Sequence, residues 1–507
     1  MQVCSRVVSL PEELRASFVR ANNRRHQKEF GQFLTPPHIA ALMASMFESQ
    51  LETVRLLDAG AGLGMLSAAF VQRELRRKTP PRRIDVTAYE LDKALIDGLH
   101  ETYDACRVAC LETGVDFSAQ VLNADFIEDG ADFLRGDLFS QAPPLFDAAI
   151  ANPPYGKLST TSSGYRRLRS IGLETTNLYT AFLNLLIGLL GKDGELVDIT
   201  PRSFCNGPYF KAFRKRLMAE MSLRRIHTFE SRSAAFKHDK VLQENIVLHA
   251  VKTPKRPQTI TISSSGGGGG EDDIRALSLP ATEIVLPSDS EAFIHIPTSE
   301  QHLAVRNEVS RLESSLERLG LTVSTGKVVG FRVREHIVQD PQADTCPLIH
   351  PCHFDGLFVT WPGERGRKPN AIRDTDNTRR LLIPSGVYVI TKRFTSKEER
   401  RRVVACIYDP NRIHSERVGF ENHLNYFHAG GNALDIPLAK GLWAYLNSSI
   451  LDLYFRQFNG HTQVNATDLR NVRFPTADQL RAIVSEVGDH SLQQNTIDQV
   501  IARELNA

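Results

Sequence analysis

The alternation of short apolar runs with longer helical segments in the first 260 residues restricts the fold more than any other feature of this sequence. Alternation of this kind is typical of an α/β domain with a doubly wound, mostly parallel sheet. The runs that predict strands are 54–60, 84–90, 119–123, 146–151 and 194–199. The segments that predict helices are 65–77, 93–113 and 177–190, and a candidate hairpin at 225–230 and 244–251 is expected to close the sheet with an antiparallel edge.

A low-complexity stretch at 263–273 divides the chain. It consists of three serines, five glycines and the acidic triplet 271–273. Such a stretch buries little apolar surface, so we predict a flexible linker there, with a disordered loop insertion as the alternative. A chain of 507 residues is too long for one ordinary domain. We therefore expect one domain at 1–262 and a second, mixed α+β domain at 274–507.

Composition excludes several classes of protein. Apolar residues make up 41% and charged residues 24%, as in a globular protein, and no apolar run is long enough to span a membrane. The net charge is only +2, although a nucleic-acid binder needs a basic face and not a basic total. No secretory signal begins the chain, so we expect a cytoplasmic protein with reduced cysteines. The spacing of Cys346, His350, Cys352 and His353 fits no standard zinc pattern, and we predict no metal site.

A glycine loop, Asp58-Ala59-Gly60-Ala61-Gly62-Leu63-Gly64, follows the first predicted strand. Small residues such as Gly60 let backbone N–H groups approach a ligand closely, and the loop alone fits a dinucleotide as well as other nucleosides. The acidic first position, Asp58, would repel a pyrophosphate but suits an ammonium group. The loop therefore favours a ligand that carries an amino acid.

Two further carboxylates follow the next two strands. Glu90 ends the second predicted strand, where a carboxylate can accept from both hydroxyls of a ribose. Asp125 follows the third and can accept from an adenine amino group while Phe126 packs on the ring; a helix cap at Asp125 and core packing of Phe126 are the alternatives. Together with Asp58 they predict a pocket for a nucleoside joined to an amino acid at the carboxyl edge of the sheet.

The tetrapeptide Asn152-Pro153-Pro154-Tyr155 follows the fourth predicted strand directly. Two prolines fix the backbone and remove two N–H donors. The Asn152 side-chain oxygen and the Pro153 carbonyl can then both accept from one –NH₂ group, and the ring of Tyr155 can stack on a planar base. This pattern predicts catalysis by positioning and electrostatics, with the amine attacking a sulfonium methyl group. A proline-rich turn without a catalytic role is the alternative.

In these motifs the sequence resembles the N6-adenine DNA methyltransferases of type II restriction–modification systems, in the branch that has its cofactor motifs first and its recognition domain last. The resemblance extends to the segment 30–37, which in the family closes over the cofactor. It implies a Rossmann-like methyltransferase sheet and a C-terminal target-recognition domain. It also implies S-adenosyl-L-methionine as cofactor, bound by Thr35, Asp58, Gly60, Glu90, Leu91, Asp125, Phe126 and Pro154, and catalysis by Asn152, Pro153 and Tyr155.

The resemblance also implies how duplex DNA is bound. Phe236 matches the family's second aromatic residue, which contacts an adenine that must be flipped out of the helix to be reached. The stretch 459–465 resembles a recognition-domain stretch and implies DNA contacts by His461, Gln463 and Asn465. Chain length and this stretch are most similar to the BsuBI/PstI type, which modifies adenine in CTGCAG. A cognate restriction endonuclease is then the functional partner.

The tetrapeptide does not choose the substrate by itself. It also occurs in enzymes that methylate a glutamine of release factors and in enzymes that methylate guanine N2 of ribosomal RNA. A DNA-binding subunit on an inactive methyltransferase fold and a fused nuclease are further alternatives. Intact cofactor and catalytic motifs oppose the inactive subunit, and no nuclease motif is evident. The long C-terminal region with basic clusters near 365–368, 379–380, 392–393 and 400–402 favours DNA.

Overall fold

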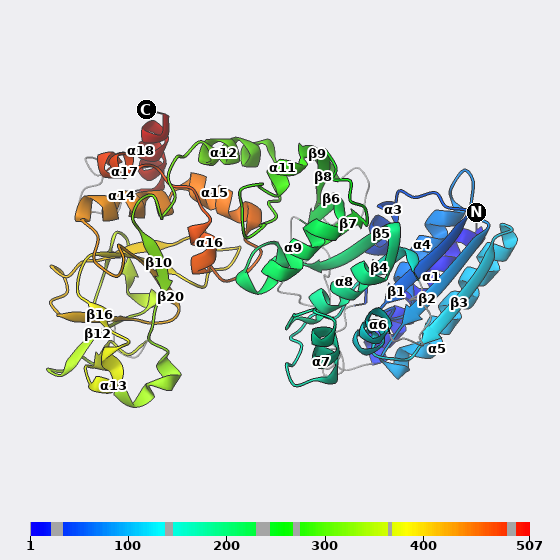
Figure 1. The fold of residues 1–507 in the computed structure, drawn as a ribbon, viewed down its shortest axis with the longest axis horizontal. Coiled ribbons are helices and arrows are strands. Elements are labelled where there is room, and N and C mark those ends of the chain that lie inside the picture. The colour runs from blue at the N-terminus through cyan, green and yellow to red at the C-terminus, as the bar shows by residue number, and fades with distance from the viewer. Residues whose placement is uncertain are drawn as a thin grey trace. The chain divides into compact units, whose positions relative to one another are not determined.

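The computed structural model describes residues 2–21, 34–136, 145–229, 244–266, 274–363, 368–483 and 493–506 (Figure 1). The chain divides into two compact units. The first unit contains Met1–Cys205 and Tyr209–Thr298, and the second contains Asn206–Pro208 and Ser299–Ala507. The two units are described separately.

The first unit is built on a nine-stranded sheet with the order β3-β2-β1-β4-β5-β7-β6-β8-β9. The five strands from β3 to β5 are parallel, whereas β7 is antiparallel to both β5 and β6. The predicted α/β class with a mostly parallel sheet is therefore confirmed. The strands are β1 (Thr53–Ala59), β2 (Arg83–Tyr89), β3 (Asp116–Leu122), β4 (Phe146–Ala151), β5 (Leu190–Pro201), β6 (Ser222–Phe229), β7 (Asn245–Val251), β8 (Thr259–Ser265) and β9 (Arg275–Pro280).

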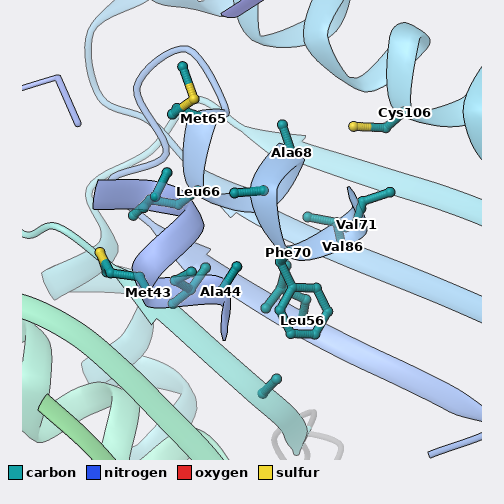
Figure 2. Close-up of a cluster of buried hydrophobic side chains, with 14 of the residues drawn as sticks. Met43, Ala44, Leu56, Met65, Leu66, Ala68, Phe70, Val71, Val86 and Cys106 are labelled. Carbon is teal, nitrogen blue, oxygen red and sulfur yellow. The ribbon is translucent and has the colours of Figure 1, made fainter. Parts of the chain in front are cut away.

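Neighbouring residues of each strand point to opposite faces of the sheet, so apolar strands place apolar side chains on both faces. Helices cover these faces and bury the side chains. On one face, Leu56 of β1 and Val86 of β2 pack in a buried cluster with α3, α4 and α5, where Phe70 and Cys106 also lie (Figure 2). Helix α6 packs against both α7 and α8, and Phe126 of α6 packs on Phe182 of α8. The helices are α1 (Gln2–Ala21), α3 (Pro37–Ser45), α4 (Met65–Leu75), α5 (Lys93–Glu112), α6 (Phe126–Arg135), α7 (Ser163–Ser170), α8 (Leu178–Leu189), α9 (Lys211–Glu220) and α11 (Ala281–Ile284).

The far end of the sheet differs from the sequence prediction in two respects. The predicted hairpin, β6 and β7, does not form the edge, because β8 pairs with β6 and β9 pairs with β8. The first part of the predicted linker, Ser263 to Ser265, belongs to β8, and the division between the units falls after Thr298.

Buried polar partners explain why serines continue this strand. The ring nitrogens of His227 on β6, which is fully buried, lie 2.9 Å from Ser263 Oγ and 3.0 Å from Ser265 Oγ. These hydrogen bonds allow the serine hydroxyls and the His227 ring to be buried together, because each polar group then has a partner. Residues 267–273 of the predicted linker lie outside the described residues.

The second unit combines two smaller sheets with helices, in agreement with the predicted mixed α+β character. One sheet has six strands in the order β10-β20-β17-β18-β14-β13, and the other has five in the order β11-β15-β12-β19-β16. The strands are β10 (Thr322–Thr325), β11 (Ile337–Val338), β12 (Thr345–Ile349), β13 (Phe354–Asp355), β14 (Phe358–Val359), β15 (Ala371–Arg373), β16 (Ile383–Pro384), β17 (Tyr388–Lys392), β18 (Ala405–Tyr408), β19 (Arg417–Phe420) and β20 (Leu424–His428). The helices are α12 (Glu300–Ser310), α13 (Asp376–Arg379), α14 (Ile436–Leu446), α15 (Ser449–Phe458), α16 (Ala466–Arg470), α17 (Ala477–Ala482) and α18 (Gln494–Asn506). Within the described ranges, no helix combines the length and apolar character needed to cross a membrane.

Candidate active site

The glycine loop connects β1 to α4 in a conformation that requires glycine. Gly60, Gly62 and Gly64 have φ angles of 79°, 59° and 80°, in the left-handed region that L-residues with a side chain rarely adopt. The N–H groups of Gly60 and Ala61 both donate to the carbonyl of Tyr89 at 2.9 Å, which connects the loop to the end of β2. The loop therefore presents backbone close to whatever lies above the carboxyl edge of the sheet.

The three predicted carboxylates lie at the ends of β1, β2 and the segment after β3, but their roles in the fold differ. Glu90 is buried, and its two oxygens accept from the N–H groups of Gly62 at 2.7 Å and Asp92 at 2.8 Å. Asp125 caps α6 by accepting from the N–H of Ile127 at 2.8 Å, so the cap alternative holds for its Oδ1. An oxygen that accepts one hydrogen bond retains a second lone pair, and a ligand can still donate to either residue.

Asp58 is fully buried beneath the glycine loop on the α4 side of the sheet. Its Oδ2 accepts from the Ser67 hydroxyl at 2.6 Å, whereas its Oδ1 has no hydrogen-bond partner among the described residues. Burial raises the pKa of Asp58 to about 7. Buried polar atoms are almost always paired, so a carboxylate oxygen without a partner among the described residues is unusual.

A cavity of about 300 Å³ opens at this edge of the sheet. Three aromatic residues, Tyr89, Phe126 and Phe182, form part of its wall. The ring centroid of Phe126 lies 5.2 Å from that of Tyr89 and 5.1 Å from that of Phe182. Leu91 also lines the cavity, although 53% of its surface is exposed. Of the predicted cofactor residues, the cavity wall includes Gly60, Glu90, Leu91, Asp125, Phe126 and Pro154.

A second cavity, of about 30 Å³, shares Leu34, Gly60, Gly62 and Asn152 with the first. The predicted Thr35 lines this cavity together with Pro11 and Arg15 of α1. Sequence reasoning missed Phe182, Pro11 and Arg15, because each is distant in sequence from the motifs and has no local pattern of its own. Residues 30–33 of the predicted N-terminal motif lie outside the described residues.

The tetrapeptide follows β4, and its first side chain has a defined orientation. Asn152 Nδ2 donates to the Thr35 hydroxyl at 3.0 Å, which leaves Oδ1 as the acceptor end of the amide. The Tyr155 hydroxyl lies 3.3 Å from that oxygen and 3.5 Å from the Ile199 carbonyl. Asn152 and Pro154 line the larger cavity, whereas Pro153 and Tyr155 are not part of its wall.

A buried carboxylate that sequence reasoning did not identify lies beside the tetrapeptide. Asp198 of β5 pairs in register with Ala151, the residue before Asn152. It is fully buried, and its Oδ1 accepts from the Thr200 hydroxyl at 2.9 Å. Burial raises the pKa of Asp198 to about 7, and burial together with this carboxylate raises the pKa of Tyr155 well above its ordinary value.

The residues expected to contact DNA differ in their surroundings in the structure. Phe236 lies outside the described residues, so its predicted role stays a prediction. His461 and Gln463 are half-buried in the loop that precedes α16. Asn465 forms a capping box with Asp468 at the start of α16, so its side chain has a structural partner.

A buried polar network fixes the conformation of that loop. Arg402, which is 2% exposed, donates to the Asn459 side chain at 2.5 Å and to the carbonyl of His461. Asn459 in turn donates to the carbonyl of Gln463 at 3.0 Å and to Asp468 at 3.2 Å. The basic cluster at 400–402 is therefore not a continuous surface patch, because one of its arginines lies in the interior.

No group of three or more potential metal ligands occurs among the described residues. His353 is committed to other contacts, because its Nδ1 accepts from the His350 N–H at 3.0 Å and its Nε2 lies 3.0 Å from Asn370 Oδ1.

The parallel strands from β3 to β5 carry a glycine loop after β1, a carboxylate after β2 and an Asn-Pro-Pro-Tyr segment after β4, which is the arrangement expected of a methyltransferase with a nucleoside cofactor. Residues 111–236 match the family of the Eco57I restriction-modification methylase. The chain is 43% identical to the type II methyltransferase M.PstI of Providencia stuartii, over 94% of this chain and 93% of the relative. It is 42% identical to M.BsuBI of Bacillus subtilis, over 90% and 89% of the two chains.

The chain belongs to this family of type II methyltransferases of restriction–modification systems, of the BsuBI/PstI type. Among solved structures, a type I restriction-modification methyltransferase subunit from Streptococcus thermophilus is 20% identical, with a TM-score of 0.37, over 52% of this chain and 58% of that chain.

Proposed function

We propose that this enzyme transfers a methyl group from S-adenosyl-L-methionine to the exocyclic N6 of a flipped-out adenine in duplex DNA. The observation that carries the proposal is the oriented amide of Asn152. Because Nδ2 donates to Thr35, Oδ1 is the atom offered to a substrate amine. An –NH₂ group that donates to Oδ1 and to the Pro153 carbonyl has its lone pair turned out of the ring plane, toward an electrophile.

The residues around the cavity suit each part of the cofactor, which supplies an electrophilic methyl group on a sulfonium. Glu90 would accept from the ribose hydroxyls, and Asp125 from the adenine amino group. Phe126, Leu91 and Pro154 would pack on the adenine ring. Asp58 has a buried oxygen without a partner in the described part of the chain, which suits the ammonium group of the methionine end.

The chain's own residues act by orientation and not as a strong base. The raised pKa of Tyr155 keeps its phenol protonated at neutral pH, so this group cannot deprotonate the amine before attack. Its hydroxyl instead lies within hydrogen-bond distance of Asn152 Oδ1. A carbonyl oxygen has two lone pairs, so Tyr155 and a substrate amine can donate to it together.

We further propose that the second unit is the target-recognition domain and that the recognised sequence is CTGCAG. Membership of the BsuBI/PstI type supports both parts of the proposal, with His461 and Gln463 in the loop before α16 as DNA contacts. Methylation of that site would protect cellular DNA from a partner endonuclease that cuts the same sequence. Adenine within a duplex must leave the stack to reach the cavity, and Phe236 is the proposed second aromatic for the flipped base.

Labelled cofactor separates the candidate substrates in one experiment. The protein is incubated with plasmid DNA, ribosomal RNA or a release factor, and we expect label in the DNA alone. Transfer to the RNA or the protein factor without transfer to DNA would contradict the proposal. Long-read sequencing of DNA from cells that express the chain then identifies the modified base and its flanking sequence, and we expect N6-methyladenine within CTGCAG.

A further inference from the structure

Four separate segments of the second unit lie side by side at one edge. Backbone hydrogen bonds connect them: Asn422 N–H donates to Val328 O at 2.9 Å, and Arg393 N–H donates to His423 O at 2.8 Å. A β-bridge joins Phe394 to Gln463 in the loop before α16. We call this set the Phe394 edge, and its segments are 327–328, 393–395, 422–423 and 462–464.

Two planar side chains are exposed together on the Phe394 edge. The Phe394 side chain is 41% exposed, and its ring centroid lies 5.0 Å from that of His423. The His423 ring is fixed from behind, because its Nδ1 lies 2.7 Å from the carboxylate of Glu421. Single exposed apolar residues are ordinary, but a supported aromatic pair offers a flat surface for a planar ligand.

Positive charge surrounds this pair. The guanidinium of Arg393 lies 5.7 Å from the Phe394 ring centroid and donates to the Asn422 carbonyl at 3.1 Å. Lys327 is exposed on the neighbouring segment, and the four segments contain no acidic residue. Glu421, the nearest acid in sequence, is 6% exposed and faces His423. The edge therefore combines exposed planar side chains with two cations that have no acidic ion-pair partner among the described residues, which suits a nucleic acid.

The edge is also rigid. The Asn425 side chain donates to the Val464 carbonyl at 2.8 Å, and the Thr395 hydroxyl donates to the Arg402 carbonyl at 2.7 Å. Arg402 in turn fixes the loop that contains Gln463, as described above. A surface whose backbone is already held in place loses less entropy when it binds a ligand.

We propose that the Phe394 edge is a duplex-DNA contact surface. Phe394 and His423 pack against sugars or base edges, Lys327 and Arg393 contact phosphates, and Gln463 reaches a base edge. The inference rests on the proposed function in one respect, namely that DNA is the substrate. The inference goes beyond the proposed function because it assigns DNA binding to four residues outside the family motifs, two of which are aromatic.

The test measures duplex affinity by fluorescence anisotropy, with CTGCAG-containing and scrambled duplexes at several salt concentrations. We expect Phe394→Ala to weaken binding to the CTGCAG duplex several-fold, because an apolar contact with a sugar or a base edge is lost. We expect Lys327→Ala to lower the slope of log affinity against log salt by about one, because one phosphate contact is lost. Phe133→Ala is the matched control, since Phe133 is 43% exposed on α6 beside the acidic Glu128, Asp129 and Asp132.

The outcomes separate the two proposals. If the unaltered protein binds and methylates DNA but Phe394→Ala matches the Phe133→Ala control and the Lys327→Ala salt slope is unchanged, the inference is wrong and the proposed function stands. If the unaltered protein neither binds nor methylates DNA, both are wrong. Cofactor affinity is measured for every variant. If Phe394→Ala also loses cofactor affinity, its fold is disturbed, and the salt slope of Lys327→Ala then decides.

Discussion

At the residue scale, the proposed catalytic asparagine depends on a partner far away in the sequence. Asn152 and Thr35 are 117 positions apart, yet their side chains are 3.0 Å apart in the structure. A side-chain amide has an NH₂ group that donates and an oxygen that accepts. A partner that binds the NH₂ group therefore leaves the oxygen to face the substrate. Thr35 was expected to contact the cofactor, and the structure adds a contact that orients the Asn152 amide.

Replacing Asn152 tests this role directly. We expect Asn152→Ala to abolish methyl transfer while cofactor affinity stays within a few-fold of the unaltered protein, because the side chain acts on the target amine. Isothermal titration calorimetry gives the affinity, and transfer of labelled methyl groups to plasmid DNA gives the activity. A large loss of cofactor affinity would instead assign Asn152 to the cofactor site.

The orientation of the amide has its own test at Thr35. Thr35→Val removes the acceptor for Asn152 Nδ2 but keeps a similar volume, and we expect kcat to fall roughly tenfold or more, the scale of a lost hydrogen bond that positions a reacting group. Thr35→Ser keeps the hydroxyl and should retain most of kcat. Equal activity of the Val and Ser variants would show that the hydroxyl does not orient the amide.

At the element scale, the last three residues of strand β8, Ser263 to Ser265, lie where the sequence predicts the start of a linker. The run Thr259-Ile260-Thr261-Ile262 has the alternation of a strand, and the serines that follow continue it because His227 provides hydrogen-bond partners. Composition alone favours a flexible segment, since Gly/Ser-rich stretches are typical of linkers. The tertiary hydrogen bonds outweigh that local preference.

A proline substitution distinguishes a strand from a linker. Ser263 lies between His227 of β6 and Ala276 of β9, so Ser263→Pro removes a backbone donor inside the sheet. We expect a loss of about 3 kcal/mol in unfolding free energy, measured by denaturant titration. Ser263→Ala, which removes only the hydroxyl, should cost about 1 kcal/mol. A proline variant as stable as the alanine variant would favour the linker.

At the scale of the whole molecule, buried carboxylates give the fold a pH dependence. Asp198 has a folded-state pKa of about 7, whereas an unfolded aspartate titrates near its ordinary value of about 4. Below the unfolded value both states are protonated. Between these two pKa values the unfolded state has lost its proton and the folded state has not, so stability falls as pH rises.

Asp198→Asn removes this contribution. We expect the unfolding free energy of the variant, relative to the unaltered protein, to rise between pH 5 and pH 8 by a few kcal/mol at most. Denaturant titrations at several pH values give the difference. A difference that is independent of pH would mean that Asp198 titrates normally in the fold.

The sequence by itself determined the α/β class, the chain positions of strands β1 to β5, and the positions of the motifs at the carboxyl ends of these strands. These follow from local patterns: apolar runs, glycines that adopt left-handed φ, and prolines that fix the backbone. Three features were decided only by the tertiary structure, namely the orientation of Asn152 by Thr35, the continuation of the sheet through β8 and β9, and the assembly of the Phe394 edge from four segments. The orientation of Asn152, the pairing of β8 with β6 and the assembly of the Phe394 edge depend on hydrogen bonds between residues far apart in the chain, and no local pattern encodes such partners.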